Sequence, residues 1–366
     1  MIQLKAMFRN CDFKVVNAKF ISSECIRVDD VPKTWNVRSI LRDACLEGNM
    51  YIATIAVTRG GIDWGYGFRE ACTGGHIGMV NFIIKQGVNW NEGLCGACEG
   101  GHLDIVNLMI EKGANDWNNG LGRACQGGHR DIVNLMIERG ATRWNLGLNA
   151  ACQGGHIDLA NLMVEKGSDW LNTGLWGACE GGRLDLVNLM IERGVNDWNL
   201  GLEYACKGGH IDLVKLMIER GANNWNSGLQ KACEGGHLNL VMLMIERGAN
   251  DWNEGLCGAC EGGHIDLAML MIEHGANEWN DGLRGACEGG HHDLVTLMIE
   301  KGAYGWNKGL EYACEEGHID LVRLMIERGA TNLNEGLYYA SKRGDYYKGR
   351  NRNIEKLLIE KGAERI

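Results

Sequence analysis

Residues 252–278 read WNEGLCGACEGGHIDLAMLMIEHGANE, and this stretch decides the fold because its pattern recurs along most of the chain. Its most constant mark is a Gly-His pair. The histidine position recurs at intervals of 27 residues after a first interval of 26: His76, His102, His129, His156, Arg183 in place of a histidine, His210, His237, His264, His291 and His318. Twelve residues before each of these positions stands a tryptophan, or in one unit Leu171. A fixed period of this length indicates a solenoid of stacked units.

Each unit predicts two short helices. In the quoted unit, three small or apolar side chains share one side of the first helix at positions i, i+3 and i+4: Leu256, Ala259 and Cys260. We expect Asn253 to cap the start of this helix, the pair Gly262-Gly263 to end it, and a second helix to start near His264. Helices of about eight to ten residues are not stable alone, so stacking must supply the stability. The predicted fold is an all-α solenoid of helix–turn–helix repeats.

Degenerate copies of the unit extend the array at both ends. Residues 37–63 match in register, and residues 333–366 match with an insertion of six residues. The pattern therefore predicts about twelve units over residues 37–366, starting near residues 37, 64, 90, 117, 144, 171, 198, 225, 252, 279, 306 and 333. Residues 1–36 are not repeat-like and have some strand-like alternation, so we expect a small N-terminal capping segment there.

The composition argues against several classes of protein. The chain has 54 glycines but one proline, and glycine follows the repeat, which is typical of neither collagen nor a flexible linker. No apolar run approaches eighteen residues, and the N-terminus lacks the apolar stretch of a signal peptide. The net charge of −10 disfavours a nucleic-acid surface and favours a partner protein with a basic or mixed surface. We therefore expect no nucleic acid and no membrane among the partners.

The repeat resembles the helical part of an ankyrin repeat. The resemblance rests on Leu-x-x-Ala-Cys-x-Gly-Gly-His-x-Asp-Leu-Val-x-Leu-Met-Ile-Glu-Arg-Gly-Ala-Asn and covers roughly residues 37–366. Ankyrin units run about 33 residues with a Thr-Pro-Leu-His start, whereas these have 27 and carry glycine where the proline would stand. The missing residues fall where the family carries its β-hairpin fingers, so we expect a tight Asn-Asp-Trp-Asn turn instead. The resemblance implies a scaffold for protein–protein interaction without catalysis. Such short repeats are similar to those of large DNA viruses and some protists. We expect a cytoplasmic location, which would be the cytosol of the host cell if the protein is viral.

The recurring cysteines and histidines predict no metal or catalytic site. Eleven cysteines occupy one repeat position, so neighbours should lie about 8–10 Å apart, whereas a disulfide needs Cα atoms within about 7 Å. They are interpreted as small buried thiols in a reducing compartment. The C-x-x-C motifs at 95–98 and 257–260 have no second pair nearby. One histidine per repeat cannot converge on an ion, so we expect hydrogen bonds to neighbouring backbone. We expect no enzyme, cofactor or metal.

The nine-fold tryptophan recurrence allows two interpretations. The rings either stack with bases or sugars, or pack between the repeats in place of the absent hairpin. The acidic charge of the chain argues against the first interpretation and favours packing.

A partner should bind where the units differ from one another. Positions ten, seven, six and three residues before the histidine position vary most, and they share one helix face, which in the ankyrin family is the concave groove. The sixth unit breaks the pattern repeatedly, with Trp170-Leu171, Trp176 and Arg183, either by drift or because a site lies there. A merely solvated face remains the alternative for any single glutamate. The predicted partner-binding residues are Trp176, Glu180, Arg183, Glu203, Tyr204, Glu234, Arg284 and Tyr312.

Two other functions stay open. The resemblance to viral ankyrin proteins suggests a substrate adaptor for a ubiquitin ligase, although no F-box-like segment is recognised at either end. Alternatively, the chain is a self-assembling structural protein. Residues 341–366 hold eight Lys and Arg against four Asp and Glu. Such a basic end can pair with the acidic array of another copy, or serve only as a soluble cap.

Overall fold

The computed structural model describes residues 37–60, 64–342 and 348–364. Within them the chain forms twelve pairs of α-helices and no strand. This confirms the predicted all-α solenoid of about twelve helix–turn–helix repeats. The expected capping segment at 1–36 lies outside the described residues. None of the described helices is long and apolar enough to cross a membrane.

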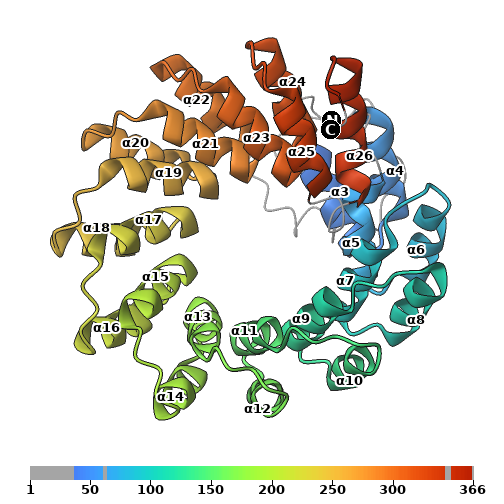
Figure 1. Cartoon of the computed structure of the whole chain (residues 1–366), viewed down its shortest axis with the longest axis horizontal. Coiled ribbons are helices and arrows are strands. Elements are labelled where there is room, and N and C mark those ends of the chain that lie inside the picture. Colours follow the sequence, from blue (N-terminus) through green and yellow to red (C-terminus); the bar gives the residue numbers. More distant parts are fainter. Residues whose placement is uncertain (1–36, 61–63, 343–347, 365–366) are drawn as a thin grey trace, which may run out of the picture.

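The helices form two concentric layers (Figure 1). The first helices of the units make the inner layer: α3 (Val37–Leu46), α5 (Gly65–Thr73), α7 (Trp90–Gly100), α9 (Trp117–Gly127), α11 (Trp144–Gly154), α13 (Asn172–Glu180), α15 (Trp198–Gly208), α17 (Trp225–Gly235), α19 (Trp252–Gly262), α21 (Trp279–Gly289), α23 (Trp306–Glu316) and α25 (Leu333–Lys342). The second helices make the outer layer: α4 (Met50–Gly60), α6 (Ile77–Ile84), α8 (Leu103–Lys112), α10 (Arg130–Glu138), α12 (Ile157–Glu165), α14 (Leu184–Glu192), α16 (Ile211–Glu219), α18 (Leu238–Glu246), α20 (Ile265–Glu273), α22 (His292–Lys301), α24 (Ile319–Glu327) and α26 (Lys348–Glu360).

The start of the inner helix α19 differs from the expectation in one respect. In the unit that contains α19, the side chain of Asp251 accepts a hydrogen bond of 3.2 Å from the backbone N–H of Glu254 and caps the helix. The helix therefore begins at Trp252, one residue earlier than expected, and Asn253 lies inside its first turn. The prediction that Asn253 is the N-cap is wrong, because the acidic side chain before the tryptophan reaches the free N–H groups first.

The Gly-Gly pair that ends most of the inner helices, from α5 to α21, serves two purposes. Gly263 has φ +82°, the left-handed conformation that ends the helix. A Cβ atom on Gly262 would lie 2.0 Å from the carbonyl oxygen of Glu234 in the preceding repeat. The first glycine thus permits close packing of successive repeats, and the second turns the chain toward the outer helix.

One continuous core runs through the array between the two layers. In each central unit it takes the same leucine, alanine and cysteine from the inner helix and apolar residues with a methionine from the outer helix. In α19 and α20 these are Leu256, Ala259, Cys260, Leu267, Ala268 and Met271. Because each unit buries these residues mainly against its neighbours, stability is shared along the stack.

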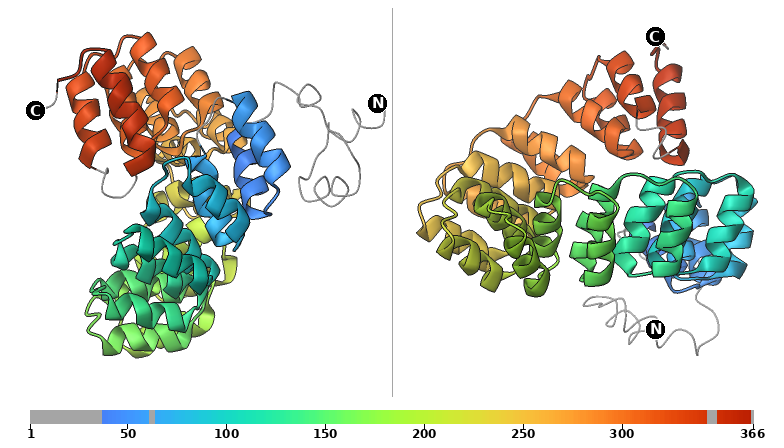
Figure 2. Two further views of the ribbon diagram at one scale, coloured as in Figure 1. Left: turned by 90° about the vertical axis from the view of Figure 1, so that its right-hand side faces the viewer. Right: turned by 60° about the horizontal axis from the view of Figure 1, so that its bottom comes forward.

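The stack curls into nearly a full superhelical turn. Viewed along its axis it forms a ring with the inner helices around a central opening, and α25 and α26 come close to α3 in projection (Figure 1). The two ends are displaced from each other along the axis, so the ring is an open turn (Figure 2). The inner face therefore curves around an enclosed space, whereas the outer helices face outward.

Candidate functional site

The recurring histidines connect adjacent repeats. The Nε2 atom of His129 lies 3.0 Å from the carbonyl oxygen of Glu99, and His210 contacts the carbonyl of Glu180 at the same distance. Because a carbonyl oxygen only accepts, the ring donates. The same contact recurs at His76, His102, His156, His237 and His318. The predicted structural role of the histidines is confirmed, and it accounts for their constancy without a ligand.

Arg183 takes over this connecting role in the sixth unit. Its Nε donates to the carbonyl oxygen of Gln153 over 3.4 Å. Arg183 therefore lies at the turn between α13 and α14, away from the inner helix face on which the other predicted binding residues stand.

A second ladder of contacts between repeats, not predicted from the sequence, uses the asparagine that follows the tryptophan in most units. The Oδ1 atom of Asn253 accepts hydrogen bonds of 2.8 and 3.1 Å from the backbone N–H groups of Asn277 and Glu278 at the entry of the next repeat. Equivalent bonds come from Asn91, Asn118, Asn199, Asn226, Asn280 and Asn307. The constancy of the Trp-Asn pair was the available signal. These bonds hold the turn between successive repeats.

The tryptophans pack at the same junctions. At the repeat position, the eight rings from Trp90 to Trp306 are half-buried against the core, and Trp64 is buried. The Arg139 guanidinium lies 5.8 Å from the ring centroid of Trp117, and Arg220 and Arg247 cover the tryptophans of their own units in the same way. These contacts support packing rather than a stacking platform.

The cysteines of the repeat position are buried and unpaired as thiols. Burial raises the pKa of Cys260 to about 12, and the other ten copies shift in the same direction for the same reason. Such thiols stay protonated and are poor nucleophiles and metal ligands. In the described part of the chain, no group of three or more His, Cys, Asp or Glu residues is placed to hold a metal ion.

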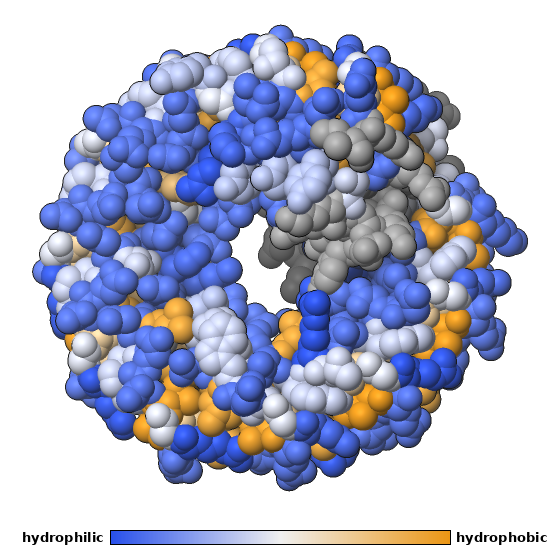
Figure 3. Space-filling model, in the orientation of Figure 1, coloured by the Kyte–Doolittle hydropathy of each residue, from blue (hydrophilic) through white to orange (hydrophobic). Residues whose placement is uncertain are grey.

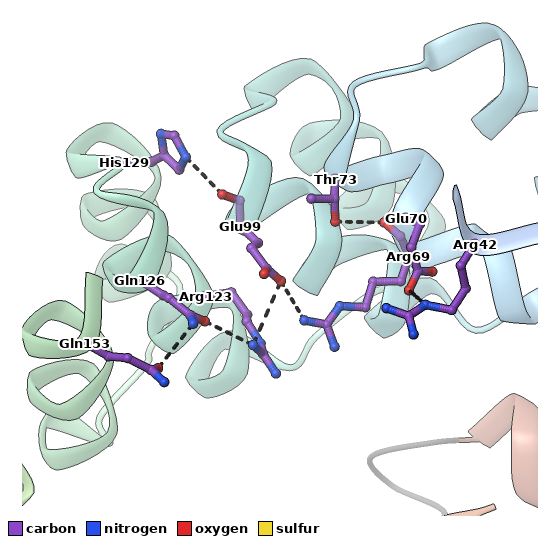
Figure 4. A network of polar contacts seen from close by, with 9 residues as sticks. All are labelled: Arg42, Arg69, Glu70, Thr73, Glu99, Arg123, Gln126, His129 and Gln153. Atoms are coloured by element: carbon purple, nitrogen blue, oxygen red, sulfur yellow. Dashed lines mark hydrogen bonds and ion pairs between the residues drawn. The ribbon is translucent and has the colours of Figure 1, made fainter. Parts of the chain in front are cut away.

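The constant positions described so far hold the repeats together. The variable residues of the inner helices are therefore the remaining candidates for a binding site. In the N-terminal half they form a connected polar network (Figure 4). Glu99 pairs with Arg69 at 2.5 Å and lies 3.9 Å from Arg123, which donates to Gln126, and Gln126 donates to Gln153. Each of these contacts joins neighbouring inner helices or turns of one helix. The positive and negative charges of this network nearly balance, and its side chains already have hydrogen-bond or ion-pair partners within the chain.

The middle of the inner face carries an aromatic cluster of Trp170, Trp176 and Tyr204. Tyr204 stacks on Trp176 with centroids 5.5 Å apart and planes 5° from parallel, and Trp170 meets Trp176 edge-to-face at 4.7 Å. Trp170 is 51% exposed. Of the predicted binding residues, Trp176 and Tyr204 are thus brought together with Trp170, whereas Arg183 is not part of the cluster.

The irregular sequence of the sixth unit creates this cluster. Trp170 stands where other units have the N-cap residue, so α13 begins only at Asn172 and has no side-chain cap. Next to Trp176, a Cβ atom on Gly177 would lie 2.1 Å from the carbonyl oxygen of Asn149, so α13 packs closely on α11. On the other side Tyr204 fills the space between α13 and α15. Two of the pattern breaks, Trp170 and Trp176, therefore meet at one place in the structure, whereas Arg183 lies apart from them at the turn.

The C-terminal half of the inner face is acidic. At the variable positions from α15 to α23, carboxylates outnumber cations by eight to four: Glu203, Glu234, Glu254, Glu261, Asp281, Glu288, Glu311 and Glu315 against Lys207, Lys231, Arg284 and Lys308. Lys207 and Lys231 both pair with Glu234, at 2.8 and 2.6 Å, and lower the pKa of that buried carboxyl. Lys207 also lies 3.7 Å from Glu180. Both lysines are therefore already paired with carboxylates of the same face.

The remaining predicted residues lie on the same face but at two separate places. Arg284 lies 5.6 Å from the ring centroid of Tyr312 and 3.8 Å from Glu288. Glu203 neighbours Tyr204, and burial raises the pKa of its carboxyl. Apart from Arg183, the predicted residues thus lie along one curved surface from α13 to α23, which Figure 3 shows bordered mainly by hydrophilic side chains.

Comparisons with known proteins identify the repeat. The family model described as "Ankyrin repeats (3 copies)" matches residues 68–146, 148–228 and 202–280, more than half of the chain. The human ASB11 ankyrin repeat domain is similar at 24% identity over 43% of this chain and 83% of that domain, with a TM-score of 0.29. The pentatricopeptide repeat protein PPR10, solved with an 18-nt psaJ RNA element, is similar at 13% identity over 98% of this chain and 69% of its own, with a TM-score of 0.28. No curated protein gives a significant match.

Proposed function

The chain belongs to the ankyrin repeat family, and from this premise we propose that it is a non-catalytic scaffold that binds a partner protein on its inner face. The observation that carries the proposal is that the constant and the variable repeat positions have different roles. Constant residues connect the repeats, whereas the variable ones gather on the inner helices. There they present a partly exposed aromatic cluster beside a row of carboxylates. Interfaces draw most of their binding energy from tryptophan, tyrosine and arginine anchors of this kind.

The predicted contact residues fall into two groups. The central group is Trp176 and Tyr204 with Glu180 and Glu203, and the peripheral group is Glu234, Arg284 and Tyr312. We propose that the central group anchors the partner because its rings lie partly open to solvent. The peripheral residues would set charge preference. Arg183 is left out of the proposed surface because its guanidinium contacts Gln153 at the turn.

The buried thiols also support a proposal on location. The structure contains thirteen free cysteines within its described residues. Such a set persists most readily where thiols are kept reduced. We therefore propose that the protein works in a reducing compartment such as the cytoplasm, including that of an infected cell if the protein is viral.

Affinity capture from a eukaryotic cell lysate with mass spectrometry tests the proposed function. The bait is the full chain, compared with a Trp176→Ala/Tyr204→Ala variant whose helical content and unfolding transition match those of the wild type. Tyr304→Ala is the matched control, because this aromatic side chain is 75% exposed on the linker between α22 and α23. We expect a partner retained by wild type and control and lost by the double variant.

Other outcomes of the same experiment separate the alternatives. Recovery of ubiquitin-ligase subunits would favour the adaptor role, and recovery of this chain alone would favour self-assembly. A partner that binds the double variant undiminished would contradict the inner-face proposal.

A further inference from the structure

The aromatic cluster offers a partner an apolar platform, and it contains a buried hydrogen-bond donor without an acceptor. Trp170 is half exposed, and its ring meets Trp176 edge-to-face. The Nε1–H group of Trp176 is buried and has no hydrogen-bond partner in the described part of the chain. A buried donor without an acceptor is uncommon in folded proteins. An unsatisfied donor of this kind is a cost to the fold, as expected of a residue retained for binding, and an apolar side chain of the partner would pack on the exposed ring of Trp170.

The acidic half of the inner face lies immediately beyond this cluster. Within the described residues, Glu254 and Glu261 have no cation within ion-pair distance, and Glu288 lies 3.8 Å from Arg284. Burial and the neighbouring carboxylates Glu234 and Glu288 raise the pKa of Glu261. Glu288 shifts in the same direction, by burial and by surrounding carboxylates. Lys207 and Lys231 act on Glu261 in the opposite direction, as Arg284 does on Glu288, but they do not reverse the shifts. The surface therefore holds negative charge that the chain neutralises only in part, and a cationic partner would relieve the remaining repulsion.

The shape of the surface favours a single strand of polypeptide over a globular domain. The inner helices curve around the central opening, so that opposite parts of the inner face look toward one another (Figures 1 and 3). Equivalent positions on adjacent helices lie about 8–10 Å apart. Three residues of a polyproline-II-like chain advance about 9 Å and return the side chain to the same face. An extended segment would therefore bring every third residue over the next repeat.

We propose that the inner face binds an extended basic segment of the partner, with an aromatic or aliphatic side chain on the Trp170–Trp176–Tyr204 cluster and Lys or Arg at about every third residue facing Glu261 and Glu288. This inference rests on the proposed function and adds the chemistry of the partner. Nucleic acid lacks the positive charge that the surface selects, and an acidic protein would be repelled.

Selection from a displayed library of random sixteen-residue peptides tests the inference with the full chain as bait. We expect enriched peptides that combine an apolar or aromatic residue with an excess of Lys and Arg. A synthetic enriched peptide should bind at least fivefold more weakly to Glu261→Gln/Glu288→Gln, and this loss should shrink as salt is added. The matched control is Glu273→Gln/Glu300→Gln, which removes two exposed carboxylates from the outer helices of the same repeats. It should leave the affinity unchanged.

The outcomes distinguish the two levels of the argument. The inference would be overturned if the enriched peptides carry no excess of Lys and Arg, or if they bind the Glu261→Gln/Glu288→Gln variant undiminished. The proposed function would still hold if these peptides no longer bind the Trp176→Ala/Tyr204→Ala variant. Peptides insensitive to every inner-face substitution would overturn both. Moving the basic residues from every third to every second position should also weaken binding, and unchanged affinity would exclude the extended register.

Discussion

Glu234 and Glu261 occupy the same position in adjacent repeats, yet their carboxyl groups have opposite electrostatic surroundings. Two lysines contact Glu234, which is 9% exposed, and they lower its pKa despite burial. Burial, followed by the charges of Glu234 and Glu288, raises the pKa of Glu261. The carboxylate of Glu234 therefore stabilises the fold, whereas that of Glu261 destabilises it. Such a cost in stability is expected of a residue retained for binding.

Neutralising these two side chains should change stability in opposite directions. Glu234→Gln leaves two lysines without their shared partner, and we expect a loss of about 1–2 kcal/mol. Glu261→Gln removes repulsion and should raise the free energy of unfolding by no more than about 0.5 kcal/mol, because solvent screens this half-exposed group. Urea unfolding of both variants measures the difference. A loss of stability in Glu261→Gln would contradict the conclusion that neighbouring carboxylates repel the charge of Glu261.

The same pair predicts how pH acts. A lowered pKa in the folded state means that the contribution of Glu234 is lost as the pH falls through that pKa. A raised folded pKa means that the penalty at Glu261 is relieved as the pH falls toward its unfolded value. The Glu234→Gln variant should therefore lose less stability than the wild type on acidification, and Glu261→Gln should lose more. Thermal unfolding between neutral pH and the carboxyl range checks the two slopes, and parallel curves for all three proteins would be inconsistent with them.

The asparagine ladder should be detectable at single amides. Asn253→Ala removes two hydrogen bonds to the next repeat, which we expect to cost about 1–2 kcal/mol and to speed hydrogen exchange at Asn277 and Glu278. Asp251→Ala removes the helix cap at a cost of about 1 kcal/mol, with faster exchange at Glu254 instead.

Asn172 provides the matched control for the ladder. It follows the tryptophan position of the sixth unit, but in the described structure it accepts no hydrogen bond from the backbone of Asn196 or Asp197. Asn172→Ala should therefore change stability by less than about 0.5 kcal/mol. An equal cost at both asparagines would show that the ladder contributes nothing specific.

Restoring histidine at residue 183 should strengthen the array. The Arg183 contact to Gln153 is 3.4 Å long, whereas His210 reaches Glu180 at 3.0 Å. We expect Arg183→His to gain about 0.5–1 kcal/mol, the value of an ordinary hydrogen bond. The reciprocal His210→Arg should lose a similar amount in urea unfolding. If both substitutions lower stability, the arginine is making a contact that histidine cannot replace.

The half-buried tryptophans set a limit on the packing energy at the junctions. A fully buried ring would cost about 3–5 kcal/mol on truncation, but Trp225 is partly open and covered by Arg247 at 5.9 Å. We expect Trp225→Ala to cost about 2 kcal/mol by the area that it loses and Arg247→Ala about 0.5–1 kcal/mol. Calorimetry of the two variants provides the comparison. A cost near zero for Trp225→Ala would argue that the ring contributes surface rather than packing.

The sequence by itself determined the features that depend on distances within one unit. The 27-residue period, the apolar spacing of Leu256, Ala259 and Cys260, and the glycine pair specify two helices and a turn. They also predicted buried thiols and histidines bonded to backbone. Each of these follows from side-chain chemistry at fixed spacing along a helix, which repeats reliably because the units are nearly identical.

Only the tertiary structure decided which residues meet across the junction between units. Asp251 caps α19, and Asn253 instead accepts hydrogen bonds from the turn that enters the next repeat. This assignment depends on how one repeat is offset against the next. The same offset stacks Tyr204 on Trp176. The curl of the ring, and the opposite surroundings of equivalent glutamates, arise because small packing differences between helices add up along the stack. No spacing within a single unit contains that information.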